Sequence, residues 1–194
     1  MRVITGTARG RKLLAPEGLD TRPSSDMTKQ AVFNILQNYV EGSVFLDLFA
    51  GSGQMGIEAL SRGARSATFI DASPKAIAVI KENLKKCGMM DRARVAMMES
   101  AGFLQGSSQQ FDLAFLDPPY QKGLMEQVLP LLEPRMAPAG IVVCETERRE
   151  ELPEQMGAFV QAKTYFYGKA KLTVYRRPAQ EGPGEEGGEE GGEE

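Results

Sequence analysis

The chain has 194 residues, 42% of them hydrophobic, which is enough for one domain with a sizeable core. It contains no histidine, and this excludes serine–histidine and cysteine–histidine catalysis as well as histidine-bound zinc. The net charge of −3 is misleading, because the acidic residues are concentrated at the end of the chain.

The first segment, residues 1–24, is basic. We interpret it as a small β-hairpin or an extended arm with short apolar pieces. Its first twelve positions hold four basic residues and no acidic one: Arg2, Arg9, Arg11 and Lys12. Such a cluster predicts contacts with nucleic acid, and the alternative is a solvated basic surface.

Residues 25–178 alternate helical and strand patterns with no internal repeat, which predicts one continuous domain. We expect helices within residues 24–39, 53–63, 73–88, 101–104 and 122–133. We expect strands within residues 43–50, 66–71, 92–98, 111–117 and 140–146. Each strand is a near-continuous apolar run, which is typical of a parallel sheet with helices on both faces.

The end of this domain breaks the alternation. Residues 158–177 contain two alternating strand patterns around Gly168, with no room for a crossover helix between them. They therefore predict an antiparallel hairpin that closes the parallel sheet.

The last segment, residues 179–194, has a different composition. Residues 181–194 carry seven glutamates and no basic residue, so the preceding part has 26 − 7 = 19 acidic and 23 basic residues, a charge of about +4. A Gly/Glu sequence cannot bury a core, and we expect it to be disordered. It serves solubility, or it competes electrostatically with an acidic ligand.

The two cysteines, Cys87 and Cys144, are far apart and outside any metal-binding spacing. We expect free thiols and no bound metal. The chain shows no secretory segment and no apolar run of about 18 residues, so we expect a cytoplasmic protein that does not enter a membrane.

A glycine-rich loop follows the first strand of the expected sheet. Gly51-Ser52-Gly53-Gln54-Met55-Gly56 has the pattern G-x-G-x-x-G between a strand and a helix. Glycines there allow a tight turn and let a ligand approach the backbone at a helix N-terminus. The pattern predicts an adenosine cofactor, without choosing between a dinucleotide and another adenosine compound.

Three further positions near strand ends are candidates for this cofactor. Asp71 ends the second strand, 18 residues after Gly53, where a carboxylate accepts the ribose hydroxyls, or only caps the next helix. Asp47 lies within an apolar strand and needs backbone donors or a cation such as an amino acid ammonium. After the third strand, Glu99 or Ser100 is placed to contact an adenine ring, or to cap a helix.

The fourth strand ends in Asp117-Pro118-Pro119-Tyr120 at the same edge of the sheet. Two prolines end the strand and stiffen the loop, which is its purely structural interpretation. The functional interpretation is that the Asp117 carboxylate and the Pro118 carbonyl accept hydrogen bonds from an amino group on a planar base. Tyr120 would stack on that base, and no histidine is needed.

These motifs together resemble the S-adenosylmethionine-dependent class I methyltransferases. "LDLFAGSGQMG" and "FLDPPY" are shared by many amino-group methyltransferases. "MRVITGTARGRKLLAP", "TRPSSD" and the late "YGKAKLTVYRR" narrow the resemblance to the RsmD family, the bacterial 16S rRNA guanine-N2 methyltransferases. The resemblance covers about residues 1–177.

The resemblance implies a Rossmann-like α/β fold with a seven-stranded, mostly parallel sheet, an antiparallel C-terminal hairpin and a small N-terminal β-arm. It implies methyl transfer to the N2 amine of a guanine in 16S rRNA, presented on an assembling small ribosomal subunit. We also expect a monomer. The implied catalytic residues are Asp117, Pro118, Pro119 and Tyr120. The implied cofactor residues are Asp47, Phe49, Gly51, Ser52, Gly53, Asp71, Ala72, Glu99 and Ser100. Substrate RNA would meet the four basic arm residues and Thr21, Arg22 and Pro23.

Other functions stay open on the residues alone. The amine could belong to adenine or cytosine in nucleic acid, or to a protein glutamine. A non-catalytic RNA-binding assembly factor would need only the basic arm. A nicotinamide-dependent oxidoreductase is supported by the glycine pattern alone, because no Tyr-x-x-x-Lys pair or histidine is present to handle a proton.

Overall fold

The computed structural model of the protein describes residues 1–16, 26–119 and 123–178. Its elements in chain order are α1 (Asp26–Leu36), β1 (Val44–Leu48), α2 (Gln54–Ser61), β2 (Ser66–Asp71), α3 (Pro74–Cys87), η1 (Met90–Arg92), β3 (Ala93–Met97), α4 (Ser100–Gly106), β4 (Phe111–Leu116), α5 (Leu124–Leu132), η2 (Glu133–Arg135), β5 (Met136–Glu147), β6 (Gln155–Met156), β7 (Phe159–Tyr167) and β8 (Ala170–Arg176).

The strands form one sheet in the order β3-β2-β1-β4-β5-β8-β7-β6. The first five strands pair in parallel, and β8, β7 and β6 continue the sheet with antiparallel pairs. The mostly parallel sheet and its antiparallel hairpin are thus confirmed. The eighth strand, β6, adds two residues to the expected seven strands, and a strand of that length leaves no alternating pattern to read.

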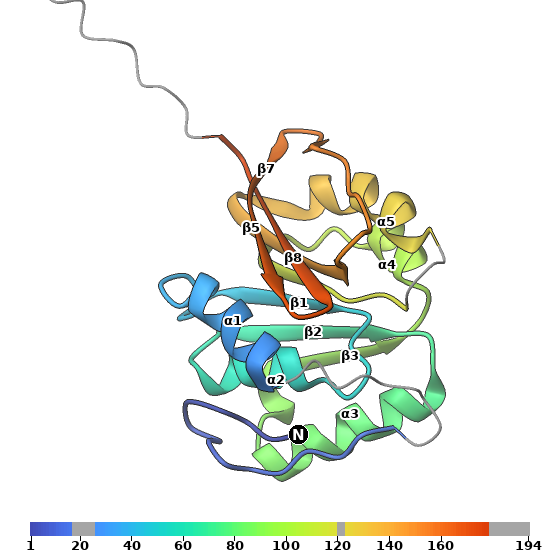
Figure 1. The fold of residues 1–194 in the computed structure, drawn as a ribbon. Helices are drawn as coiled ribbons and strands as arrows, with labels where there is room; N and C mark the ends of the chain where they lie inside the picture. Colours follow the sequence, from blue (N-terminus) through green and yellow to red (C-terminus); the bar gives the residue numbers. More distant parts are fainter. Residues whose placement is uncertain (17–25, 120–122, 179–194) are drawn as a thin grey trace, which may run out of the picture.

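Helices cover both faces of the sheet, as the apolar strands predicted (Figure 1). One buried cluster joins the sheet to α1, α2 and α3, and a second joins the opposite face to α4 and α5. α3 begins at Pro74 after the N-cap Ser73 and ends before Gly88, in agreement with the sequence pattern. In the described parts of the chain, no helix is long and apolar enough to cross a membrane.

The N-terminal segment packs on α2 and α3 as part of the core. One antiparallel bridge, between Arg2 and Lys12, is all the β-pairing of the expected arm within the described residues. Val3, Ala8 and Leu13 are buried in the same cluster as the helices α1 to α3. The arm is therefore an irregular loop held by tertiary contacts rather than by strand pairing.

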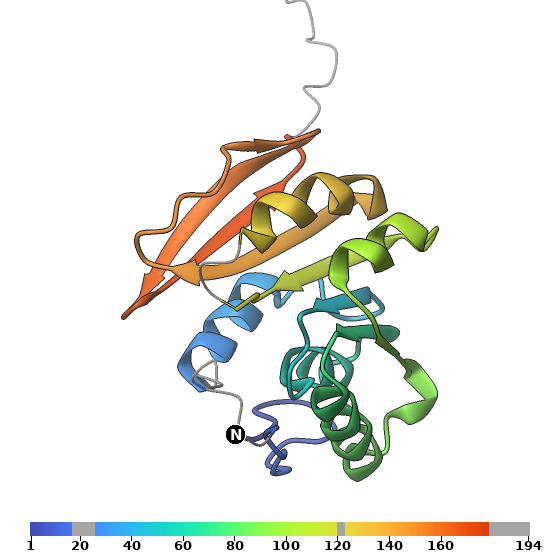
Figure 2. The same ribbon diagram turned by 90° about the vertical axis from the view of Figure 1, so that its right-hand side faces the viewer.

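The carboxyl ends of the parallel strands gather at one edge of the sheet. In Figure 2 the ends of β4 and β5, the start of α1 and the turn between β7 and β8 all lie toward the left. Parallel strands bring every strand-end loop to the same side, and this positions the candidate site.

Candidate active site

Three acidic side chains meet at the carboxyl edge of neighbouring strands. Asp47 of β1 lies opposite Phe69 of β2 and Phe115 of β4 in the parallel register. Asp71 follows two positions beyond that level on β2, and Asp117 follows two positions beyond it after β4. The register thus brings together residues that are up to 70 positions apart (117 − 47) in the sequence.

Asp47 is the most buried of the three, with 2% of its surface exposed. Burial raises the pKa of its carboxyl to about 8, a hydrogen bond from the Gly56 backbone N–H (2.9 Å) opposes this, and the charges of Asp117 and Asp71 add to it. An unliganded Asp47 therefore holds a proton near neutral pH. A cation placed beside it would favour the ionised carboxylate.

The glycine loop turns sharply after β1. Phe49 has a positive φ of 91°, which is unusual for a residue with a side chain and is a strained backbone conformation. A Cβ atom added to Gly51 would meet nothing within 4 Å, whereas one added to Gly56 would lie 2.3 Å from the Phe69 ring. Gly51 thus leaves open space above the loop, and Gly56 lets α2 pack closely on β2.

Asp71 holds the backbone of two loops at once. Its Oδ2 accepts a hydrogen bond from the Gly51 N–H (2.9 Å), and its Oδ1 accepts one from the Ser73 N–H (2.8 Å). The cap of α3 is the Ser73 side chain, which accepts from the Ala76 N–H. Asp71 therefore positions the glycine loop directly, and the neighbouring Ala72 is exposed.

The two candidates for an adenine contact lie where β3 passes into α4. Ser100 is buried at the first position of α4, and Glu99 precedes it as an exposed N-cap residue. The Met98 N–H donates to the Asp71 carbonyl (3.1 Å), so this segment lies beside the end of β2. Both residues border the same edge as Asp71, and they stay candidates.

The Asp-Pro-Pro segment ends β4 beside β1. Asp117 is half-buried, Pro118 is buried and Pro119 is exposed. Because β4 pairs directly with β1, the Asp117 carboxyl lies near enough to Asp47 to raise its pKa. Tyr120 lies outside the described residues, as do Thr21, Arg22 and Pro23.

The basic residues of the arm do not all lie together. Arg2 and Arg9 line a hollow of about 400 Å³ between the arm and the start of α1, and Asp26 borders it 3.6 Å from the Arg2 guanidinium. Arg11 instead donates to the Lys86 carbonyl near the end of α3. Lys12 is exposed beside the Arg2 bridge.

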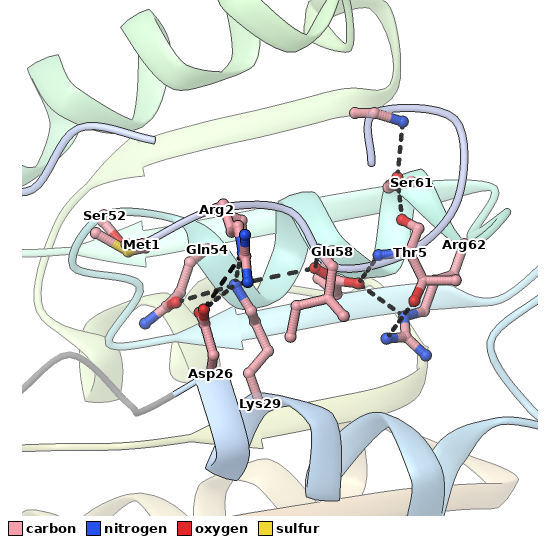
Figure 3. Close-up of polar contacts among 12 residues, drawn as sticks. Met1, Arg2, Thr5, Asp26, Lys29, Ser52, Gln54, Glu58, Ser61 and Arg62 are labelled. Atoms are coloured by element: carbon pink, nitrogen blue, oxygen red, sulfur yellow. Dashed lines mark hydrogen bonds and ion pairs between the residues drawn. The ribbon is translucent and has the colours of Figure 1, made fainter. Parts of the chain in front are cut away.

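A buried ion network anchors the arm, and sequence reasoning missed it (Figure 3). Glu58 of α2 accepts hydrogen bonds from the backbone N–H groups of Ile4 (2.8 Å) and Thr5 (2.9 Å). It also pairs with Arg62 at 2.9 Å and with the fully buried Lys29 at 3.9 Å. The available signal was a single charged residue in a helix whose other residues are all uncharged.

Lys29 connects this network to the start of α2. Its ammonium donates to the Arg2 carbonyl and to Gln54 Oε1 (3.3 Å). Burial lowers the pKa of Lys29, and the carboxylates of Glu58 and Asp26 oppose that effect. Removing Glu58 would leave the buried Lys29 ammonium with only Asp26, at 4.0 Å, as an ion-pair partner.

Asn83 of α3 is a second residue that the sequence pattern did not single out. Its Nδ2 donates to the carbonyls of Leu14 (3.0 Å) and Ser52 (2.9 Å), and its Oδ1 accepts from the Leu14 N–H (2.8 Å). One buried amide thus joins the arm to the glycine loop. Its signal was a polar residue within the apolar stripe of a helix.

The residues at this edge fit an adenosine sulfonium cofactor by their chemistry. Asp47 offers a buried acid to an ammonium, Asp71 offers carboxylate oxygens to hydroxyls, and Gly51 leaves the loop surface open.

A family model described as "Conserved hypothetical protein 95" matches residues 1–176. Ribosomal RNA small subunit methyltransferase D of Haemophilus influenzae is 41% identical over 78% of this chain and 81% of its own length. The chain belongs to the RsmD family. The protein of the same name from Escherichia coli K12 is 33% identical to this RsmD-family chain, over 93% of this chain and 91% of its own. The expected family membership is confirmed.

Solved structures agree with the RsmD fold. The yhhF protein of Escherichia coli superposes with a TM-score of 0.83 at 34% identity, covering 93% of this chain and 99% of that chain. An RNA methyltransferase from Salinibacter ruber in complex with S-adenosyl-L-homocysteine has a TM-score of 0.64 at 16% identity, covering 81% and 95%. The second likeness concerns the fold alone, and both agree with a Rossmann-like class I architecture.

Proposed function

We propose that this RsmD-family protein transfers a methyl group from S-adenosylmethionine to the exocyclic N2 amine of a guanine in 16S rRNA. One observation carries the proposal: the Asp117-Pro118 segment ends β4 directly beside β1, whose loop is held by Asp71. An acceptor pair for an amine and a loop for an adenosine cofactor thus share one edge. The names of the relatives support ribosomal RNA as the substrate.

The proposed cofactor site is formed by residues at the carboxyl ends of β1, β2 and β3. Asp47 would bind the ammonium of the methionine part, and the Gly51–Gly53 turn, with Phe49 and Ser52, would lie against it. Asp71 and Ala72 would border the ribose, and Glu99 or Ser100 the adenine. S-adenosylmethionine would supply an electrophilic methyl on a sulfonium. The guanine amine would form the new N–C bond and lose one proton, while the S–C bond breaks and S-adenosylhomocysteine leaves as a neutral thioether.

The Asp117 loop would orient the amine. An aromatic amine is a poor nucleophile because its lone pair is delocalised into the ring. Acceptors at the Asp117 carboxylate and the Pro118 carbonyl would hold its two hydrogens and direct the lone pair toward the cofactor. Such orientation lowers a barrier by up to about 7–11 kcal/mol. We also propose that Asp117 receives the released proton and that Tyr120 stacks on the base.

The proposed substrate is 16S rRNA in an assembling small subunit. Arg2, Arg9, Arg11 and Lys12 would contact phosphates, with Thr21, Arg22 and Pro23 at the cleft. We also propose that the protein acts as a monomer, without a metal, in the cytoplasm.

The test uses the full chain, labelled cofactor and small subunits that lack the modification, followed by mass spectrometry of the rRNA nucleosides. We expect N2-methylguanine with the wild type. Asp117→Ala should lower kcat by about 100-fold or more, since misorientation alone can cost that much. Cofactor affinity measured by calorimetry should stay within a few fold.

Asp91→Ala is the matched control, because Asp91 is an exposed acid in η1, before β3 and away from the strand ends. It should retain full activity. Label in adenine, cytosine or protein, or no label at all, would overturn the guanine assignment.

A further inference from the structure

The turn between β7 and β8 projects beyond the candidate active site. β4 ends at Leu116, which pairs with Cys144, whereas β5 continues to Glu147 opposite Ala170. Three more residues of strand (147 − 144) add roughly 10 Å beyond the end of β4. The turn and the start of α1, beside the arm, both lie on the side where β4 and β5 end (Figure 2).

The hairpin is basic throughout. From Phe159 to Arg177 it contains five basic residues and no acidic one. Lys171 is engaged by the Glu150 carbonyl and by Glu151 (3.7 Å), and Arg177 by Glu133 (3.3 Å). Lys169 is exposed in the turn, and Arg148 is exposed just after β5. Lys163 is exposed farther along β7, where it shares a face of the sheet with Tyr165, opposite to that of Phe166.

Three consecutive aromatic residues precede the turn, namely Tyr165, Phe166 and Tyr167. Phe166 is 51% exposed, although a phenyl ring in water is unfavourable. The Arg148 guanidinium lies 4.6 Å from the Phe166 ring centroid, and the Lys163 ammonium lies 5.0 Å from that of Tyr165. Two of the three rings thus have a cation beside them. Single-stranded nucleic acid can bind to such a pair by stacking a base on the ring and placing a phosphate near the cation.

We propose that the β7–β8 turn, together with Arg148, is a second RNA-contacting element of this protein. Phe166 stacks on a base next to the target guanine, and Lys169 and Arg148 contact the flanking phosphates. The element deepens the proposed function and rests on it for the position of the target. Charge favours RNA over a basic protein partner, because the exposed cations would repel the basic surface of another RNA-binding protein.

The test measures binding of short single-stranded RNA by fluorescence anisotropy, with no methyl transfer needed. Phe166→Ala should weaken binding by about fivefold or more, the loss expected for one stacked base. Phe166→Leu should weaken RNA binding as much as Phe166→Ala, and Phe166→Trp should bind RNA at least as tightly as the wild type. A purely structural apolar role would not require an aromatic ring at this position. Lys169→Ala should reduce the slope of log affinity against log salt by about 0.7.

Two matched controls lie elsewhere on the surface. Met90→Ala removes an exposed apolar side chain before β3, and Arg65→Ala removes an exposed cation before β2. Both should bind RNA like the wild type. Thermal unfolding of every variant should stay close to that of the wild type.

Hairpin variants that bind RNA no differently from these controls would overturn the proposal. Hairpin variants could also bind naked RNA like the wild type but fail to bind intact small subunits. That result would indicate that the turn contacts a ribosomal protein, and it would overturn the proposal as well. Failure of the guanine assignment alone would leave the RNA-binding losses in place, so the two proposals fail separately.

Discussion

At the scale of single residues, the candidate site holds three acidic side chains close together. Asp47, Asp71 and Asp117 gather at one sheet edge, and the pKa of Asp47 rises to about 8 in consequence of burial and of these neighbours. A core tolerates such a group only at a cost in stability. This cost is expected where binding of a cation offsets it, because function often uses a group that the fold alone would not select.

Replacing Asp47 by Asn should reveal this cost through the pH dependence of stability. The folded-state pKa of about 8 exceeds the ordinary value of 3.8. The contribution of the carboxyl is therefore fully present below about pH 3.8 and is lost as the pH rises toward 8. Asn still accepts from the Gly56 N–H and does not titrate. Thermal unfolding should show the variant gaining about 4 °C or more over the wild type between pH 4 and pH 8.

The same variant should bind S-adenosylmethionine about tenfold more weakly or worse, since the ammonium loses its partner. Asp91→Asn, at an exposed acid, should show neither effect. A variant less stable than the wild type at pH 8 would contradict the prediction, because it would mean that the fold stabilises the ionised carboxylate.

At the scale of elements, the N-terminal arm depends on α2 rather than on its own pairing. Its backbone donates to Glu58 and to Ser61, while Ser61 Oγ donates to the Thr5 carbonyl (2.6 Å). The arm approaches so closely at Gly6 that an added Cβ would lie 1.8 Å from the Ser61 carbonyl oxygen. Asn83 then links the arm to the glycine loop. We therefore expect substitutions that disrupt the arm to disturb the glycine loop as well.

Gly6→Ala tests this close approach, and Gly10→Ala is its matched control. Both glycines have a positive φ, of 85° and 81°, so both substitutions cost about 1–2 kcal/mol of conformational energy. Only Gly6 adds a backbone clash, since nothing lies within 4 Å of a Cβ at Gly10. Chemical denaturation should show a clearly larger loss for Gly6→Ala, together with faster hydrogen exchange at Ile4 and Thr5. Equal losses would contradict the close packing.

At the scale of the whole molecule, the charge is divided between a basic body and an acidic tail. Residues 181–194 carry seven of the 26 acidic residues. If this tail competes with RNA for the basic surface, deleting it should raise RNA affinity several-fold at low salt. The gain should vanish at high salt, because the Debye length falls from about 10 Å at 0.1 M to about 3 Å at 1 M.

A tail in which all seven glutamates are replaced by glutamine separates charge from length. It should match the deletion in anisotropy titrations of RNA across salt concentrations. A glutamine tail that binds RNA like the wild type would instead assign the tail to solubility.

The sequence by itself determined the fold class, because apolar strand runs alternating with capped helices permit little other than a parallel α/β sheet. The sequence also identified the glycine turn, Asp71 and the proline segment as candidate site residues, because each belongs to a local pattern with a local physical reason. The closing hairpin followed from two alternating strands around Gly168. Neither β6 nor the irregular course of the arm had such a local signal.

Only the tertiary structure decided which of these residues meet. The β1–β4 register places Asp117 beside Asp47, and strand order is not a local property of either segment. Lys29 and Glu58 join across two helices, and Asn83 joins the arm to the glycine loop. Because β5 and β8 extend past the end of β4, the β7–β8 turn projects beyond the candidate active site. Short-range propensity specifies elements, whereas burial and long-range hydrogen bonding specify their partners.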